Sequence, residues 1–417
     1  MAPGELPESF RNRTGKVDMF EKDCPVPESF RSMLWNILFL ALLFFLTFIA
    51  RFIFSPLMPE IEENLSITHS QSGTLFLVMS SGFFMGQVLS GFISSRLNHR
   101  GALTLSTLGI GAALLSVNLI SGLWLLRVVM VILGFTAGLH LPSAMATITA
   151  MVERKEWGKA MAVHQTAPAV SLILGPFLII WLTGLLSWKG ILSIIGAVAV
   201  ITGILFMFFG RCGEFPGDPP RLPLLRELVK VRSFWIMVVL FALAMAGTIG
   251  IYSMLPLYLV NERGFSTEHA GTLLGLSRIC GLFMPFVSGW FITRIGEKRF
   301  IFIVMMLSGI GTIMLGTLSG GFLVGMIFIQ PAVIGCYFTA GFASLARIVQ
   351  PHLRSIAASF TTPAAFLIGG GLFPALLGYM GQDYSFGMGI VFAGGLMILL
   401  SPLVFMLSLI EKIEEGC

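Results

Sequence analysis

Charged residues are scarce in this 417-residue chain: Asp, Glu, Lys and Arg together make up 11% of it, whereas hydrophobic residues make up 56%. Soluble domains average about 25% charged residues. The shortage therefore excludes a globule covered by water. Apolar runs instead repeatedly exceed the roughly 18 residues needed to cross a bilayer. Because these runs are long and rich in glycine, the sequence predicts an all-α integral membrane protein rather than a barrel of short strands.

Cysteine is also sparse, and the five cysteines form neither a CxxC pair nor a spacing typical of metal ligands. We expect free thiols, no metal and no cofactor. The sequence has no P-loop, HExxH pair or nucleophile elbow, which argues against ATP drive and against an enzyme. Residues 1–32 lack the apolar core and cleavage site of a secretory signal, so we interpret them as a flexible cytoplasmic tail.

Twelve apolar runs are predicted as transmembrane helices. They cover 33–58, 72–95, 101–121, 123–150, 158–186, 188–210, 233–260, 268–293, 299–318, 321–346, 354–380 and 384–410. These spans divide the chain into five segments. They are the tail (1–32), a first bundle (33–210), a central loop (211–232), a second bundle (233–410) and a C-terminal segment (411–417).

The lysines and arginines set the expected orientation of the spans. With the N-terminus inside, 21 of the 26 fall on the cytoplasmic side, which predicts cytoplasmic termini. The net positive charge then reflects topology and anionic lipid, and it does not indicate nucleic acid. We expect a monomer in the plasma membrane, the inner membrane if the cell is bacterial.

The sequence repeats itself at an interval of 198 residues. Gly-Thr-Leu at 73–75 returns at 271–273, Gly91 returns as Gly289, and Pro176 returns as Pro374. Three markers at one spacing indicate two six-helix, pseudo-symmetric halves related by duplication, which is how one large class of transporters is built.

Spans two and eight both end in a pattern of glycine and basic residues. Its members are Gly91, Arg96 and Arg100 in the first copy, and Gly289, Arg294, Gly296, Lys298 and Arg299 in the second. With twelve spans and the duplication, the chain resembles the major facilitator superfamily of secondary transporters over nearly its whole length after the tail. The resemblance implies that these residues form cytoplasmic gate loops. Ser95 and Thr293 replace the Asp that this family prefers, which departs from its usual charge relay.

None of the 21 Asp and Glu residues falls well inside a predicted span. Proton-coupled porters commonly use a buried carboxylate, so a proton carried here requires a histidine, the cargo's own acid group or Glu60 at the end of the first span. His140 lies near the middle of span four, and His164 lies in the cytoplasmic part of span five. Imidazole titrates near neutral pH. Both are candidates for proton coupling, and a neutral histidine bonded between helices is the alternative for each.

Three arginines lie inside spans, at different depths. Arg127 is close enough to the outer surface for its side chain to reach the headgroups. Arg51 lies about seven residues, roughly 10 Å, inside the outer end of span one. Arg278 lies roughly 15 Å deep, at the midplane, where a charge costs at least about 3 kcal/mol. Since no intramembrane acid is available, we expect Arg278 to face a water-filled cavity and to bind an anion through its planar fork; a guanidinium bonded to main-chain oxygens in packed protein is the alternative.

Arg278 is the principal candidate for substrate binding, and Arg51 is the second. Tyr252, Tyr337 and Gln330 are candidate cavity donors on spans seven and ten; aromatic packing is the alternative for the two tyrosines. Monocarboxylate porters of the superfamily also carry an arginine in the middle of helix eight, and the resemblance implies the same role for Arg278. The sequence therefore predicts a secondary transporter that moves a small organic anion, a monocarboxylate, by alternating access with protons. A proton-driven multidrug or small-solute efflux pump of the same superfamily is the alternative, and a sensor that keeps the fold is a third possibility.

Overall fold

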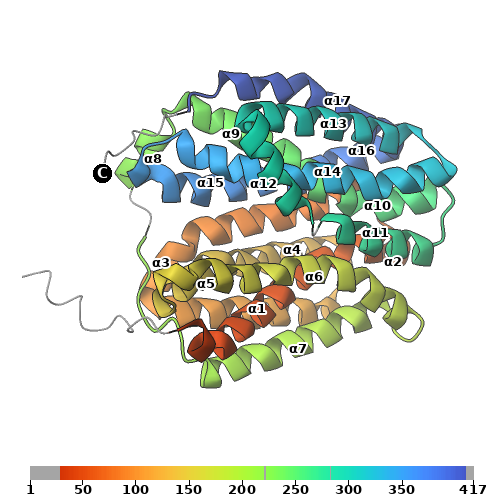
Figure 1. The fold of residues 1–417 in the computed structure, drawn as a ribbon. Helices are drawn as coiled ribbons and strands as arrows, with labels where there is room; N and C mark the ends of the chain where they lie inside the picture. Colours follow the sequence, from red (N-terminus) through yellow and green to blue (C-terminus); the bar gives the residue numbers. More distant parts are fainter. Residues whose placement is uncertain (1–28, 220–221, 282, 410–417) are drawn as a thin grey trace, which may run out of the picture.

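The computed structural model describes residues 29–219, 222–281 and 283–409. The described residues form helices and no strands, as the sequence predicts. Residues 1–28 of the predicted tail, 1–32, and the whole of the C-terminal segment, 411–417, lie outside them. The helices form two bundles, which we call the first half (up to residue 209) and the second half (from residue 232), and they lie one above the other in Figure 1.

Seven helices make up the first half. They are α1 (Phe30–Phe52), α2 (Phe54–Leu65), α3 (His69–Leu115), α4 (Leu123–Gly138), α5 (His140–Met151), α6 (Trp157–Thr183) and α7 (Trp188–Phe209), with short 3-10 turns η2 (Ser116–Leu119) and η3 (Arg154–Glu156). The central loop carries one short helix, α8 (Leu222–Leu228), which marks one end of the bundle, the central-loop end.

The second half repeats this plan with more interruptions. It consists of α9 (Arg232–Met245), η4 (Ala246–Gly250), α10 (Ile251–Asn261), α11 (Thr267–Gly281), α12 (Met284–Ile295), α13 (Glu297–Thr317), α14 (Gly320–Arg347), η5 (Pro351–Leu353), α15 (Arg354–Leu367), η6 (Ile368–Leu372), α16 (Phe373–Asp383), α17 (Phe386–Leu400) and η7 (Ser401–Met406). The turns η4 and η6 are π-helical. The triple glycine at 369–371 lies in η6. It makes the eleventh predicted span, 354–380, the most easily bent.

Ten continuous helical segments of the described chain are long and apolar enough to cross a membrane. The twelve predicted spans fit this number because α3 contains two of them, and because the eighth is divided into α11 and α12. In α3 the chain turns at Asn98, whose φ is +58°, and the Asn98 side chain accepts a hydrogen bond from the Gly101 amide at 2.7 Å. The side chain thus caps the start of the third span.

The first predicted span ends too early at residue 58. The helix runs on through α2 to Leu65, so Glu60, Glu62 and Glu63 belong to it rather than following it. Glu60 does not turn inward, because its carboxylate accepts a hydrogen bond from the Trp188 amide at the start of α7. Such a contact satisfies a free N–H group at a helix N-terminus. Glu60 is thereby used in joining two helices.

Glycines allow the closest helix contact of the first half, between α3 and α4. A Cβ added at Gly82 or Gly86 would collide with a main-chain oxygen of α4, and one added at Gly134 or Gly138 would collide with α3. The sequence spacing of Gly82 and Gly86 is that of a small-xxx-small pair, which permits such an approach in membranes. This packing fixes the wall of the first half that faces the second.

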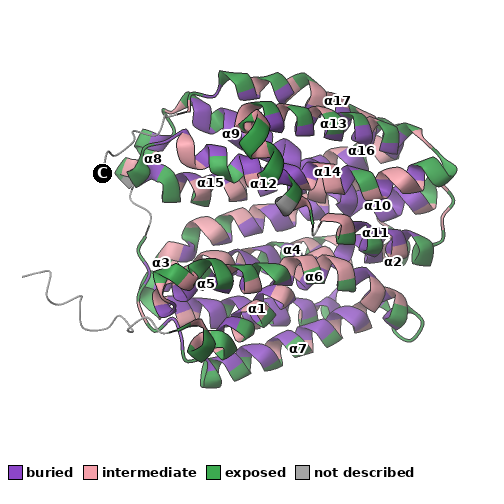
Figure 2. Ribbon diagram, viewed as in Figure 1, coloured by how far each residue is buried: buried purple, intermediate pink, exposed green. Residues whose placement is uncertain are grey.

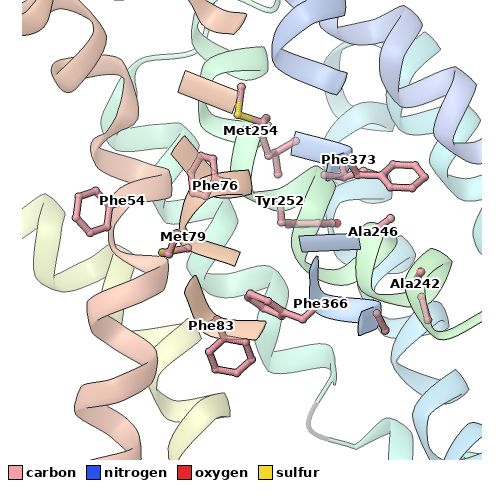
Figure 3. Packing of buried hydrophobic residues seen from close by; sticks show 14 of the residues in the cluster. Phe54, Phe76, Met79, Phe83, Ala242, Ala246, Tyr252, Met254, Phe366 and Phe373 are labelled. Carbon is pink, nitrogen blue, oxygen red and sulfur yellow. The ribbon is translucent and has the colours of Figure 1, made fainter. Parts of the chain in front are cut away.

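The two halves meet mainly through α2, α3 and α6 of the first and α10, α11, α15, η6 and α16 of the second. Gly73 on α3 lies against the main chain of Pro374 and Ala375, and the His69 amide donates to the Gln382 side chain at 3.2 Å. These contacts lie at the end of the bundle opposite the central loop. Nearer the middle, the ring centres of Phe83 and Phe366, from different halves, are 4.8 Å apart. Both side chains are labelled in Figure 3.

Burial follows the expected membrane pattern. Side chains between the helices are buried, whereas the outward faces expose large apolar residues such as Trp124 and Phe322, 75% and 79% exposed (Figure 2). Apolar side chains on the outside of a helical bundle suit contact with lipid.

We expect Gly134→Leu to lower the midpoint of thermal unfolding of the purified protein in detergent by several degrees. The new side chain has no room against the Met79 carbonyl, so α3 and α4 must separate. Gly158→Ala is the matched control, because no atom lies within 4 Å of the added Cβ. Equal midpoints for wild type and Gly134→Leu would contradict this packing.

Candidate functional site

A small cavity lies between the two halves near the middle of the bundle. Four predicted spans form its wall: α1 and α2, α6, η4 and α10, and α11. Its volume is about 30 Å³, enough for one or two water molecules. The polar residues of the wall are Ser55, Ser171, Tyr252, Ser253 and Arg278.

Arg278 lies in this wall, on the last turn of α11. One guanidinium N–H donates to the Thr248 carbonyl at 2.9 Å, and the guanidinium carbon lies 4.2 Å from the centre of the Tyr252 ring. Thr248 belongs to the π-helical turn η4. The side chain is partly exposed, so donors beyond the one bound to Thr248 are available to a molecule in the cavity.

The break after α11 adds to this environment. The sequence predicts an unbroken span from 268 to 293, but α11 ends at Gly281, three residues after Arg278. The C-terminus of a helix carries partial negative charge and favours nearby cations. Discontinuous helices often form the central sites of transporters. Gly281 and Pro285 beside the break are the signal that could have revealed it. It was not predicted because the stretch is as apolar as a continuous span.

Tyr252 packs against the guanidinium of Arg278. Its ring presents a face to the guanidinium, which is a cation–π contact. Its hydroxyl donates to the Ile327 carbonyl at 2.9 Å, and its own carbonyl accepts a hydrogen bond from Ser55 of the first half. Tyr252 therefore connects the arginine to both halves.

The other hydroxyls of the cavity wall are already engaged. Ser171 donates to the Phe45 carbonyl and Ser253 donates to the Ile249 carbonyl. Among the residues that line the cavity there is no carboxylate. Arg278 is thus the charged donor that this wall offers.

Arg51 does not line the cavity. It is 2% exposed and lies among phenylalanine rings, with one N–H donating to the Thr47 carbonyl at 3.3 Å and another terminal nitrogen, Nη1, without a partner. The guanidinium carbon is 4.2 to 5.5 Å from the centres of four rings: Phe48, Phe52, Phe83 and Phe366. Phe366 belongs to the second half. We call these four rings the Arg51 cage.

Gln330 and Tyr337 lie in the interior of the second half. Both are fully buried, and neither lines the cavity. The Gln330 amide donates to the Gly247 carbonyl at 3.2 Å and to Thr312 at 3.1 Å. The ring of Tyr337 packs edge-on against Phe241 at 5.1 Å. In this arrangement of the halves both residues hold helices together.

His140 and His164 come together, although they are 24 residues apart in the sequence. Their Nε2 atoms are 3.4 Å apart, and both side chains are fully buried. Sequence reasoning treated them as separate candidates, because a distance between two helices is not readable from spacing along the chain.

The predicted gate residues lie at the central-loop end, away from the cavity. Arg100 pairs with Glu214 of the central loop, Lys298 donates to the Leu407 carbonyl at 2.6 Å, and Gly296 has a φ of +81°, which favours glycine. Arg294 lies over the ring of Trp290, 4.0 Å from its centre. The structure gives no comparable partner for Gly91, Arg96, Gly289 or Arg299 among the described residues.

A charged contact that the sequence reasoning missed lies beside the second gate loop. Glu297 accepts hydrogen bonds from Arg347 at 2.9 Å and from Ser344 at 3.1 Å, both on α14. An acid four residues after Thr293 therefore ties this loop to a neighbouring helix. In the central loop, burial raises the pKa of the Cys212 thiol to about 12, which keeps it protonated at neutral pH.

Curated relatives of the chain are transporters and sensors at low identity. A D-galactonate transporter of Escherichia coli O6:H1 is 21% identical over 82% of this chain and 87% of its own length. A probable sulfoacetate transporter of Cupriavidus necator is 22% identical over 62% and 64%. The membrane sensor protein UhpC of Escherichia coli K12 is 23% identical over 69% and 70%.

A solved structure shares the fold, and a family model covers most of the chain. A bacterial homolog of the human lysosomal transporter Spinster, in an inward-facing and occupied conformation, superposes with a TM-score of 0.80 at 16% identity, over 91% of this chain and 97% of the other. The model of the Major Facilitator Superfamily matches residues 40–321. With its twelve spans in two halves, this integral membrane protein belongs to the major facilitator superfamily of secondary transporters.

Proposed function

We propose that this transporter carries a small organic anion, a monocarboxylate, by alternating access and together with a proton, with Arg278 as the counter-ion of the cargo. The observation that carries the proposal is the position of Arg278 in the wall of a cavity that both halves share. Such a cavity can open to either side when the halves rock about it.

The charge of the wall favours an anion over a cation. A guanidinium at this depth lacks the solvation of water, and the Thr248 carbonyl and the Tyr252 ring compensate it only in part. An arriving carboxylate accepts two parallel N–H bonds from the guanidinium fork. A cationic cargo has no carboxylate to bind among the lining residues, which argues against a pump for cationic drugs.

The relatives point to the same chemical class. Galactonate and sulfoacetate, named for two of the transporters, are both organic acids. At about 30 Å³ the cavity is smaller than either molecule. The cargo must therefore enter in an arrangement in which the halves lie further apart.

Arg51 is a second contact for the anion in such an arrangement. One ring of the Arg51 cage, Phe366, belongs to the second half, so separation of the halves uncovers the guanidinium. Gln330 and Tyr337 bind cargo only if the second half itself rearranges, because both are now fully buried in it.

Sensing is a second candidate function, favoured by the likeness to UhpC. A sensor would bind the anion at Arg278 without moving it. Uptake by reconstituted protein separates the two functions, since binding without transport indicates a sensor.

Arg278→Gln should weaken anion binding at least about 30-fold, because removing one partner of a desolvated charge pair costs about 2 kcal/mol or more. Arg278→Lys should weaken it about tenfold, since it keeps the charge and loses the fork. The measurement is the rise in unfolding temperature with galactonate, sulfoacetate and lactate.

Arg127→Gln is the matched control, because Arg127 lies within a span, contacts Thr74 at 3.4 Å and does not line the cavity. Its binding should equal that of the wild type. Undiminished binding by Arg278→Gln would remove the proposed counter-ion.

Tyr252→Leu should weaken anion binding several-fold, since the ring that holds the guanidinium in place is lost. Tyr252→Phe keeps the ring and loses the bond to the Ile327 carbonyl, so it should lower stability by about 1 kcal/mol with little change in affinity. Titration of both variants with the same anions checks this. Equal affinities for the two variants would show that the ring does not matter.

We further propose that both termini face the cytoplasm. A green fluorescent protein fused after Cys417 should then fluoresce, and alkaline phosphatase at that site should be inactive. Phosphatase inserted after Ser121, between η2 and α4, should be active. The reverse pattern would invert the proposed orientation.

A further inference from the structure

Two histidines and a phenylalanine form a closed stack inside the first half. His140 begins α5, His164 lies in α6 and Phe44 lies in α1. The planes of the two imidazoles differ by 2°, and their Nε2 atoms face each other at 3.4 Å. The Phe44 ring lies parallel to both, with its centre 4.9 Å from that of His140 and 4.4 Å from that of His164. We call this arrangement the histidine pair.

The hydrogen-bond donors and acceptors of the two rings determine how many protons the pair can hold. When both rings are neutral, one Nε2–H donates to the bare Nε2 of the other ring, whose own proton is then on Nδ1. Both Nδ1 atoms are buried without a partner in the structure. The donor ring thus has a bare Nδ1, and this atom can accept one proton without breaking the bond between the rings.

A second proton has no comparable place. It would have to bind the Nε2 that accepts the bond, which would set two N–H groups and two positive rings edge to edge at 3.4 Å. Two like charges in a site without water strongly disfavour this state. The pair therefore holds one proton more than its neutral form.

Phe44 stabilises the protonated form. A cation over the face of an aromatic ring is attracted by its electrons, and the attraction is larger where water is absent. Because the phenyl ring overlies both imidazoles, the contact persists whichever ring holds the charge. Burial opposes the charge at the same time, so the proton is held reversibly.

The other ionisable groups on neighbouring helices lie further along them. The basic residues and histidines are Arg31 and Arg51 on α1, His69, Arg96, His99 and Arg100 on α3, Arg127 on α4, Arg154 and Lys155 in η3, Lys159 on α6, Lys189 on α7, and His269 and Arg278 on α11. The carboxylates are near helix ends: Glu60, Glu62 and Glu63 on α2, Glu156 in η3 and Glu268 on α11. Arg51 follows Phe44 by seven residues, roughly 10 Å along the helix, and its charge favours departure of the proton.

We propose that His140 and His164 act as one unit that binds a single transported proton, with Phe44 as the face that stabilises it. The proton comes from hydronium on one side of the membrane, forms an N–H bond at the bare Nδ1, and returns to water on the other side. His164 precedes Ser171 of the cavity wall by seven residues on α6, so an anion in the cavity lies roughly 10 Å from the pair. The inference deepens the proposed function and rests on it for the choice of cargo.

The first test needs no cargo. The full chain is labelled with 15N-histidine in lipid nanodiscs, and its six histidines are followed by NMR from pH 4 to pH 9. We expect His140 and His164 to share one transition that takes up one proton. His140→Gln and His164→Gln should each abolish it, and Phe44→Leu should move it to lower pH. His269→Gln, an exposed histidine, should leave it unchanged.

The second test separates exchange from proton-driven accumulation. Proteoliposomes are given labelled galactonate, either on both sides or with a pH gradient. The two His→Gln variants should keep exchange within about threefold of wild type and lose at least tenfold in accumulation driven by the gradient. Normal accumulation, uptake of one proton by each ring independently, or no transition between pH 4 and pH 9 would overturn the proposal. If the wild type moves no galactonate, the proposed cargo fails, and the NMR titration alone decides on the histidine pair.

Discussion

Inside this transporter, the fold must stabilise positively charged side chains that contact no carboxylate among the described residues. Two arginines lie deep in the spans, and neither makes an ion pair in the described structure. Aromatic faces and main-chain oxygens replace the acid in both cases. Such contacts are weaker than a buried ion pair, and at Arg51 they leave Nη1 without a partner. Each arginine is therefore placed to gain from an anion that reaches it.

The two arginines differ in which half completes their surroundings. Arg278 obtains its main contacts from Thr248 and Tyr252 of its own half and faces the shared cavity. Arg51 is enclosed by rings of both halves and has no opening to the cavity. Since the cavity that they share is only about 30 Å³, the two halves lie close together at this level.

Much of the fold was predictable because it depends on local properties. Apolar run length gives the spans, the 198-residue repeat gives the two halves, and the spacing of Gly82 and Gly86 gives a close helix contact. The distance of Arg278 from the ends of its predicted span could likewise be counted along the sequence. These features need no knowledge of which helices meet.

What the sequence did not reveal involves contacts between distant segments. The Arg51 cage joins Phe366 to a residue more than 300 positions earlier, and the histidine pair joins two helices at one depth. The helix break beyond Arg278 was missed although Gly281 and Pro285 flank it, because prolines also occur inside unbroken helices such as α6. The continuation of the first span to Leu65 was missed because Glu60, Glu62 and Glu63 look like the end of a span, whereas Trp188 and His69 bind two of these acids.

The mixed origin of the Arg51 cage has a consequence for the energetics of movement. Removing a guanidinium from water costs free energy that four phenyl rings return only in part. That cost is highest while Phe366 lies against the arginine, and it falls as soon as water reaches the unpaired nitrogen. While the halves are in contact, the buried guanidinium of Arg51 thus raises the free energy of the protein. This cost lowers the barrier to separating the halves, even when the cavity is empty.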